Sequence, residues 1–424
     1  MMLKLSKLML IAIMLTSGLF AQTATAPSGT GTANDPYLVS TLNNLYWITQ
    51  NSGEWSKVYK QTANIDATDT QNWDNGAGFL PIGNGTTKFT GSYNGQNHTI
   101  DAIYISRSST DNIGLFGCTD NANINNLGVT NVNITGHSYT GGLKGYNSNT
   151  SSSNADTIIN CYSTGTVSGN DYVGGLMGSN APGKIDNCYS TCSVSGPWYI
   201  GGLVSHTERS NIANCYSTGS VSATSSPYAG GFCCDNDGST IDKCYSTGSV
   251  SDGGSGFVYT NGGTITDCFW DTQTSGKNTG IIDGTPTGAT GKTTTQMKSV
   301  ATFTDEDSTG LTTAWDFVSN PYDDAANEDI WDMDVSGSIN SGYPYLSWQD
   351  GADQSLPVEL TSFTATAGDG QVTLKWVTES EIENLGFNIY RSANSNPPAG
   401  GQFLIINDEL IPGAGNSSSR HEYE

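Results

Sequence analysis

The sequence predicts an all-β fold, a right-handed parallel β-helix (β-solenoid), and three observations lead to this prediction. Gly occupies 52 of 424 positions and charged residues make up only 13%, a composition that disfavours helical bundles and α/β enzymes. A block beginning with Asn-Cys-Tyr-Ser-Thr recurs in the middle of the chain. The repeats contain short β-prone runs separated by Gly, Ser, Asn and Asp, and none of them has helical periodicity.

Residues 1–21 have the layout of a secretory signal peptide. Lys4 and Lys7 precede an apolar run at residues 8–15, and small residues follow it. We expect cleavage after Ala21 and export to the cell surface or the medium. No other stretch approaches the roughly 18 apolar residues that a membrane span needs, so no span is expected.

The charge balance limits the possible partners. The chain has 16 Lys plus Arg against 40 Asp plus Glu, a formal net charge of -24. Nucleic acids and anionic membranes would be repelled by such a chain. We therefore expect no nucleic-acid partner.

Residues 22–139 are predicted to hold an N-terminal cap and the first, irregular coils of the β-helix. The end of a β-helix exposes unpaired strand edges and has to be covered. Either Ser40 or Thr41 is a suitable N-cap for a short amphipathic helix. The apolar residues of this helix are Leu42, Leu45, Tyr46 and Ile48.

Residues 140–272 form the repeats, with a period of about 27 residues. One Cys marks each period, and an Ile stands three residues before it. The Cys residues are Cys161, Cys188, Cys215, Cys244 and Cys268. One period cannot bury its apolar side alone, whereas stacked periods form ladders of identical side chains at about 4.8 Å per coil. A β-propeller blade needs about 40 residues, more than these periods provide.

The remainder of the chain divides at about residue 350. Residues 273–350 are less repetitive and rich in aromatic residues, and we expect them to close the β-helix. Residues 351–424 resemble the opening of a fibronectin type III-like sandwich, of the kind found near the C-terminus of Bacteroidetes-type exported proteins. They are shorter than the roughly 90 to 100 residues of such a sandwich, so a truncated module is expected.

Several motifs together resemble the bacterial GLUG-motif proteins. They are Gly-Gly-Leu-Met-Gly at 174–178, the Asn-Cys-Tyr-Ser-Thr-Gly copies, the lead-in at 89–100, and the tail motifs at 315–317 and 343–346. The resemblance covers residues 29–350 and implies a secreted or surface-displayed, adhesin-like β-helix without agreed catalytic residues. The closing Gly of the motif is replaced by Ser205 in one copy and by Cys234 in the next, so we expect two irregular coils there.

The nine cysteines and one acidic loop are candidate cross-linking and metal sites. Equivalent Cys side chains on adjacent parallel strands point the same way, which fits a disulfide poorly, so we interpret the repeated Cys as buried apolar groups. Asp332, Asp334 and Ser336 match the first oxygen positions of a calcium loop. Position 12 of that loop is Tyr343, where a carboxylate is required. We therefore predict no metal site or cofactor, with weak calcium binding as the alternative.

A register-matched aromatic row is the main candidate for ligand binding. Tyr162, Tyr189, Tyr216 and Tyr245 each follow a repeated Cys. If the Cys points inward, alternation turns the rings outward, where they could stack on sugar rings. If the Tyr points inward, the row is core packing. Trp198 and Tyr199 are a second candidate, for which loop packing is the alternative.

These features predict a non-catalytic, adhesin-like protein that acts as a monomer. Its expected partner is a carbohydrate or a host or matrix surface. A polysaccharide lyase or hydrolase is the alternative, based on fold analogy, and Asp186 and Asp242 share one repeat position that other residue types fill elsewhere. A structural spacer of a surface layer is the third possibility.

Overall fold

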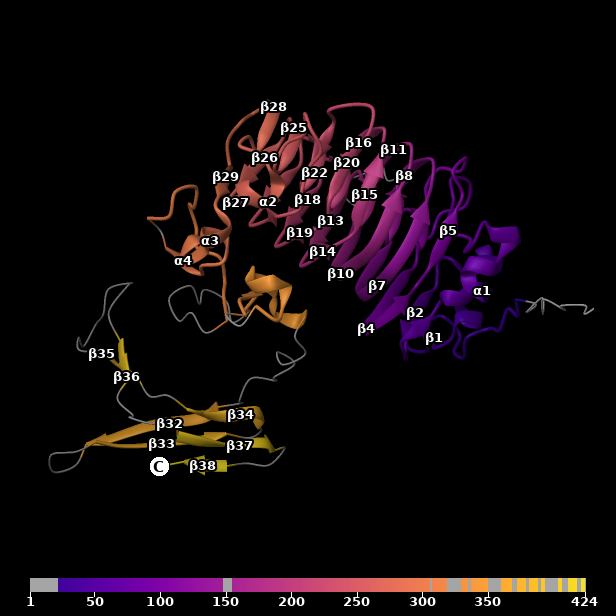
Figure 1. Ribbon diagram of the computed structural model, residues 1–424. Coiled ribbons are helices and arrows are strands. Elements are labelled where there is room, and N and C mark those ends of the chain that lie inside the picture. The colour runs from indigo at the N-terminus through magenta and orange to yellow at the C-terminus, as the bar shows by residue number, and fades with distance from the viewer. Residues whose placement is uncertain are drawn as a thin grey trace, which may run out of the picture.

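The computed structural model describes residues 22–147, 155–305, 307–318, 329–334 and 337–349, together with the strands named below between 360 and 423. Residues 1–21, where the signal peptide is predicted, lie outside this part of the chain. The described elements are mostly β-strands, and the main sheets are parallel (Figure 1). The prediction of an all-β protein is therefore confirmed.

Three parallel sheets run side by side through residues 37–292, which we call the repeat stack. The four-stranded sheet contains β8 (Ser138–Thr140), β11 (Asp171–Gly174), β16 (Trp198–Gly201) and β21 (Ala229–Gly230). The seven-stranded sheet contains β6 (Phe116–Thr119), β9 (Lys144–Asn147), β12 (Met177–Asn180), β17 (Val204–Glu208), β22 (Cys233–Asp237), β25 (Val258–Asn261) and β28 (Ile281–Gly284).

The large sheet has 18 strands within the described residues. Its first strands are β1 (Tyr37–Val39), β2 (Val58–Gln61), β3 (Ile65–Asp66), β4 (Ser92–Asp101), β5 (Tyr104–Ser106), β7 (Asn123–Thr135) and β10 (Asp156–Ser168). The repeats then add β13 (Gly183–Asp186), β14 (Tyr189–Ser190), β15 (Ser193–Gly196), β18 (Asn211–Ala213), β19 (Tyr216–Ser217), β20 (Val221–Ala223), β23 (Thr240–Asp242), β24 (Tyr245–Ser246), β26 (Thr264–Thr266), β27 (Cys268–Asp271) and β29 (Ala289–Lys292).

Consecutive repeats pair in parallel, and each residue lies beside its equivalent one period away. Ile185 pairs with Ile158 on one side and with Ile212 on the other, and Ile212 pairs with Ile241. These isoleucines are at most 1% exposed and belong to the main core. The predicted ladders of identical side chains are therefore present.

The repeated cysteines point into the same core. All nine cysteines of the chain are buried thiols, and none forms a disulfide. The thiols of Cys161, Cys188 and Cys215 donate to backbone carbonyls nearby. The interpretation of these residues as buried apolar groups is confirmed.

The N-terminal helix was predicted correctly. Helix α1 covers Leu42–Gln50, and Thr41 is its N-cap, accepting a hydrogen bond from the backbone N–H of Asn44. Leu45 and Ile48 are fully buried and join the core of the stack. The helix thus covers apolar side chains beside the first strands.

The two coils that were expected to be irregular are regular. Strands β17 and β22 pair in continuous parallel register. Ser205, in place of the closing Gly, is buried and donates a hydrogen bond of 2.6 Å to the carbonyl of Tyr199. The expectation of distortion was wrong because the hydroxyl finds an acceptor within its own corner.

After the last repeat, the described residues between 294 and 349 pack against the outside of the stack rather than extending it, and we call them the closing section. They contain α3 (Thr294–Met297), α4 (Ala301–Thr304), β30 (Trp331–Asp332) and β31 (Tyr345–Leu346), preceded by α2 (Thr272–Ser275). Trp315, Trp331 and Leu346 are fully buried in a second apolar cluster, separate from the main core. Figure 1 shows this section beside β14 and β19.

The C-terminal strands pair in antiparallel fashion. They are β32 (Leu360–Ala367), β33 (Val372–Thr378), β34 (Glu381–Phe387), β35 (Tyr390–Ser392), β36 (Phe403–Ile405), β37 (Ile411–Ser417) and β38 (His421–Tyr423). Their assignment to a truncated fibronectin type III-like sandwich stays a prediction, as do the domain boundaries.

The stacked core generates a stability prediction. Replacing Ile212 by Ala removes a fully buried side chain between two equivalent isoleucines, so the free energy of unfolding should fall by about 2–5 kcal/mol. The exposed neighbour Asn211 provides the matched control, because Asn211→Ala should change it by less than about 0.5 kcal/mol. Urea unfolding followed by circular dichroism measures both, and equal losses would contradict the inward orientation of the isoleucine ladder.

Candidate functional site

The first tyrosine row consists of Tyr162, Tyr189, Tyr216 and Tyr245 on the large sheet. These residues pair with one another in register. Neighbouring ring centroids lie 4.7, 4.8 and 5.1 Å apart, with interplanar angles of 9°, 2° and 6°. Because the preceding cysteines occupy the main core, alternation turns these rings out of the stack.

The closing section covers much of this row. The indole of Trp331 lies 6.2 Å from the ring of Tyr216 and 5.9 Å from that of Tyr245. The Tyr216 hydroxyl donates a 2.9 Å hydrogen bond to Gln349, and the Tyr245 hydroxyl donates to the carbonyl of Pro344. Tyr216 and Tyr245 are 1% and 0% exposed. The rings therefore point out of the main core but are buried in the second apolar cluster.

This burial corrects the expectation of a continuous exposed row. Three of the four predicted ligand-binding tyrosines are buried: Tyr189 is 9% exposed, Tyr216 1% and Tyr245 0%. In addition, each inner ring has both of its faces stacked on its neighbours, so no sugar can lie on them. Only the ring at the end of the row, Tyr162, is partly exposed.

The row ends at Tyr162 because the preceding strand supplies a glycine. Gly128 is the register partner of Tyr162, and a Cβ atom at this position would collide with the phenol ring of Tyr162. The absent side chain leaves room for the ring to lie against the backbone of the preceding repeat. The end of the row thus has a different surface from its middle.

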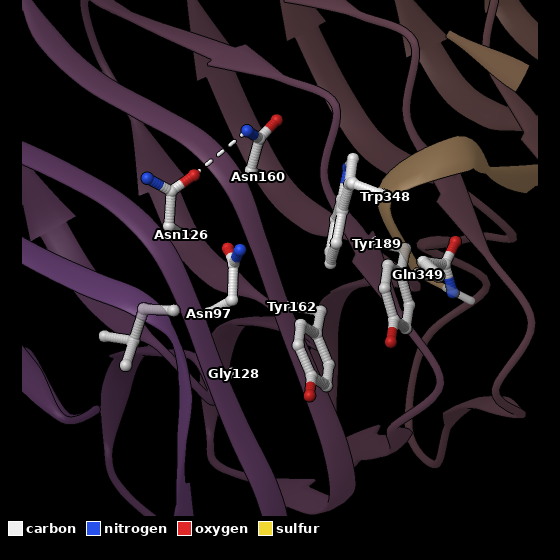
Figure 2. Close-up of a pocket in the computed structure, with 9 residues that line it drawn as sticks. Asn97, Asn126, Gly128, Asn160, Tyr162, Tyr189, Trp348 and Gln349 are labelled. Atoms are coloured by element: carbon white, nitrogen blue, oxygen red, sulfur yellow. Dashed lines mark hydrogen bonds between the residues drawn. The ribbon is translucent and has the colours of Figure 1, made fainter. Parts of the chain in front are cut away.

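A pocket of about 220 Å³ lies at this end of the row (Figure 2). Asparagines form one side of it, and aromatic rings form the other. The lining residues are Asn97, Asn126, Leu127, Gly128, Asn160, Tyr162, Tyr189, Trp348 and Gln349. The Trp348 indole, from the closing section, lies 5.9 Å from the rings of both Tyr162 and Tyr189. The pocket is smaller than the roughly 300–1,000 Å³ that drug-sized ligands occupy.

The asparagines occupy corners where the backbone is left-handed. The φ angles of Asn97, Asn126 and Asn160 are 60°, 51° and 51°, a conformation that Asn tolerates better than most residues. The Asn160 amide donates a 3.0 Å hydrogen bond to the side-chain oxygen of Asn126. The Asn160 side-chain oxygen is buried and accepts no hydrogen bond in the described part of the chain. Two of the three amides on this wall, those of Asn126 and Asn160, are therefore held by side-chain hydrogen bonds.

Trp198 and Tyr199, the second pair predicted from the sequence, lie on the four-stranded sheet. Tyr199 belongs to a second tyrosine row with Tyr139, Tyr172 and Tyr228, whose neighbouring centroids are 5.0, 4.9 and 4.9 Å apart. Trp198 is 43% exposed, and its indole lies 6.2 Å from the ring of Tyr228. The repeated spacing of a Tyr two residues before each Gly pair was a signal for this row.

The carboxylates of the acidic loop accept hydrogen bonds from other groups of the protein. Asp332 accepts hydrogen bonds from the Met333 N–H and from the Tyr345 hydroxyl, both at 2.6 Å. Asp334 accepts from the N–H and hydroxyl of Ser338 and from the Ile339 N–H. Ser336 lies outside the described residues. Among the described residues, no group of three or more His, Cys, Asp or Glu is placed to hold a metal ion.

Asp186 and Asp242 lie two repeats apart, with Ala213 of the intervening repeat between them in register. Two steps of about 4.8 Å each separate their backbones. Asp186 is also paired with Lys184 at 2.8 Å and accepts from the Asn214 amide. Of the residues predicted from the sequence, the structure thus brings together Tyr162 and Tyr189, with the asparagines beside them.

Comparison with known protein families finds a match within the repeats. Residues 196–222 match a family model described as the GLUG motif. This segment includes Trp198, Tyr199 and Tyr216, so the chain contains the GLUG motif.

Two curated proteins have related sequences. Halomucin of Haloquadratum walsbyi is 40% identical over 158 residues, which are 36% of this chain and 2% of halomucin. A putative Gly-rich membrane protein of Evansella cellulosilytica is 32% identical over 116 residues, 27% of this chain and 13% of that protein. The chain therefore spans only a small part of either relative. No solved structure matches the chain significantly.

The covered tyrosines generate a pH prediction. Burial raises the pKa of Tyr216 and Tyr245 well above the usual value of about 10. Above about pH 10 the unfolded chain loses these protons while the folded chain keeps them, so the free energy of unfolding should be steady below about pH 10 and fall above it.

Unfolding by urea at a series of alkaline pH values measures this fall. The double variant Tyr216→Phe, Tyr245→Phe has two fewer such protons, so its stability should decline less steeply with pH than that of the wild type. The control is Tyr228→Phe, whose ring belongs to the half-buried second row. A double variant with the wild-type slope would mean that these hydroxyls are not enclosed.

Proposed function

We propose that this chain is a secreted or cell-surface, non-catalytic, adhesin-like protein that binds carbohydrate in the pocket at the end of the first tyrosine row. The observation that carries the proposal is the pairing of an amide wall, formed by Asn97, Asn126 and Asn160, with an aromatic wall that includes Tyr162 and Trp348. Amides donate to and accept from sugar hydroxyls, and aromatic rings provide an apolar surface for the C–H groups of a sugar. The pocket volume suits a single sugar unit rather than a long segment.

The proposal extends to the fold and the location of the protein. We take the three-sheet stack to be a right-handed parallel β-helix that acts as a monomer and is exported by its predicted signal peptide. The GLUG motif, the low charged content and the name of the membrane-protein relative are in keeping with a surface location. The described residues contain no helix that is long and apolar enough to cross a membrane. The ligand is then a glycan of a host or matrix surface.

A structural spacer is the second candidate, because one observation favours it. Most of the first tyrosine row is used to attach the closing section, which is a purely structural role for the most regular feature of the repeats. A spacer needs no ligand at the pocket. The enzyme alternative has no comparable support, since it rests on fold analogy.

Binding at the pocket is testable with two variants and a matched control. Asn160→Gly keeps the left-handed backbone but removes a pocket amide, and Trp348→Ala removes the aromatic wall. Asn214→Gly makes the same change at an equivalent corner with a φ of 51°, away from the pocket. On a glycan array, each pocket variant should lose about tenfold or more in affinity, equivalent to about 1.4 kcal/mol, and the control should bind like the wild type.

Circular dichroism checks that all three variants fold. Wild-type binding that survives in both pocket variants would contradict this site. A wild type that binds no glycan or matrix protein would favour the spacer.

A further inference from the structure

The second tyrosine row presents an aromatic surface on a different sheet from the pocket. Tyr139, Tyr172, Tyr199 and Tyr228 are half-buried, whereas Tyr216 and Tyr245 of the first row are enclosed. In Figure 1, β8, β11 and β16, which carry most of this row, lie away from the closing section. The side chains of the second row thus remain available to a partner.

The backbone at this row is strained for the residue type it carries. The φ angles of Tyr139, Tyr172 and Tyr199 are 57°, 53° and 49°, in the left-handed region that bulky side chains rarely adopt. Asn is the commonest non-Gly residue at the other left-handed corners of the described chain, as at Asn160 and Asn214. Stacking of the rings offsets part of the strain. Strained, partly exposed residues of this kind are common at functional sites.

A buried acceptor without a donor lies beside this surface. Asp171 is the register partner of Trp198 on the adjacent strand. The Oδ1 atom of Asp171 is buried and accepts no hydrogen bond from the described residues, and burial raises the pKa of this carboxyl group. The Asp171 side chain as a whole is only half-buried, so a rotation of its carboxyl group would bring this oxygen to a sugar hydroxyl. The C–H face of the same sugar would stack on the exposed indole of Trp198.

The charges around the row restrict the ligand. Burial raises the pKa of Asp235, and the carboxylates of Asp237 and Asp283 add to the effect, while His206 opposes it. The pKa of Tyr172 is raised to about 12, so its hydroxyl stays protonated and can donate at neutral pH. Uronic acids and sulfated sugars would be repelled by these carboxylates.

We propose that Asp171, Trp198 and the adjoining rings of Tyr199 and Tyr228 form a second carbohydrate site, selective for polysaccharides without negative charge. This inference rests on the proposed function and adds a second site to it. Two sites on different sheets of one chain allow it to bridge two polysaccharide chains or to bind one surface with avidity.

The test measures binding of the full chain to insoluble cellulose and chitin and to soluble amylose, with alginate as the anionic comparison. Trp198→Ala and Asp171→Asn are made in the wild type and in the Trp348→Ala background, in which the pocket is impaired. Leu80→Ala is the control, because Leu80 is 45% exposed and Trp198 is 43% exposed. Trp198→Phe should preserve most of the stacking.

In the Trp348→Ala background, Trp198→Ala should reduce the remaining binding to an uncharged polysaccharide at least tenfold, with little change for Leu80→Ala. In the wild-type background, Trp198→Ala should retain binding at the pocket but lose the ability to agglutinate polysaccharide-coated beads. Binding that Trp198→Ala and Asp171→Asn leave unchanged would overturn the second site while leaving the pocket intact. Preferential binding to alginate would overturn the charge selectivity, and failure of the wild type to bind any glycan would instead remove the proposed function itself.

Discussion

Parallel, in-register pairing between consecutive repeats is the constraint on which the rest of the structure depends. Each position in a repeat lies beside the same position one period away, so a residue type that recurs in the repeats forms a row of identical side chains. An isoleucine becomes a core ladder and a cysteine a line of buried thiols. The same constraint fixes two rows of tyrosines, which have the same chemistry and different surroundings.

Stacking itself limits what an aromatic row can do. Rings that are nearly parallel and about 5 Å apart stack their faces on each other, so an inner ring offers only its edge and its hydroxyl to a ligand. The ring edges of the first row pack against the closing section, and the end of the row, at Tyr162 and Tyr189, borders the pocket. The second row keeps its edges at the surface beside Trp198. Ligand binding is therefore expected at the ends and edges of the rows rather than along their faces.

The sequence predicts the periodic part of this arrangement well and the rest poorly. The period correctly predicts that Cys161 is buried in the core, and the Thr41 N-cap follows from local chemistry. The same pattern leaves open whether Tyr162 points outward or into the core. The hydrogen bond that helps to cover Tyr216 joins it to Gln349, 133 positions away. No repeat or spacing in the sequence predicts such a contact. Asn97 and Asn126 belong to the irregular first coils, so their proximity to Trp348 becomes visible only in the folded chain.

The most direct test of this account is chemical modification of surface tyrosines in the folded protein, with the labelled sites identified by mass spectrometry. Tetranitromethane nitrates accessible phenol rings. The account predicts nitration of Tyr199 and Tyr228, partial nitration of Tyr162, and protection of Tyr216 and Tyr245 until the protein is unfolded. Equal labelling of both rows in the folded protein would contradict the claim that one row is enclosed and the other is open.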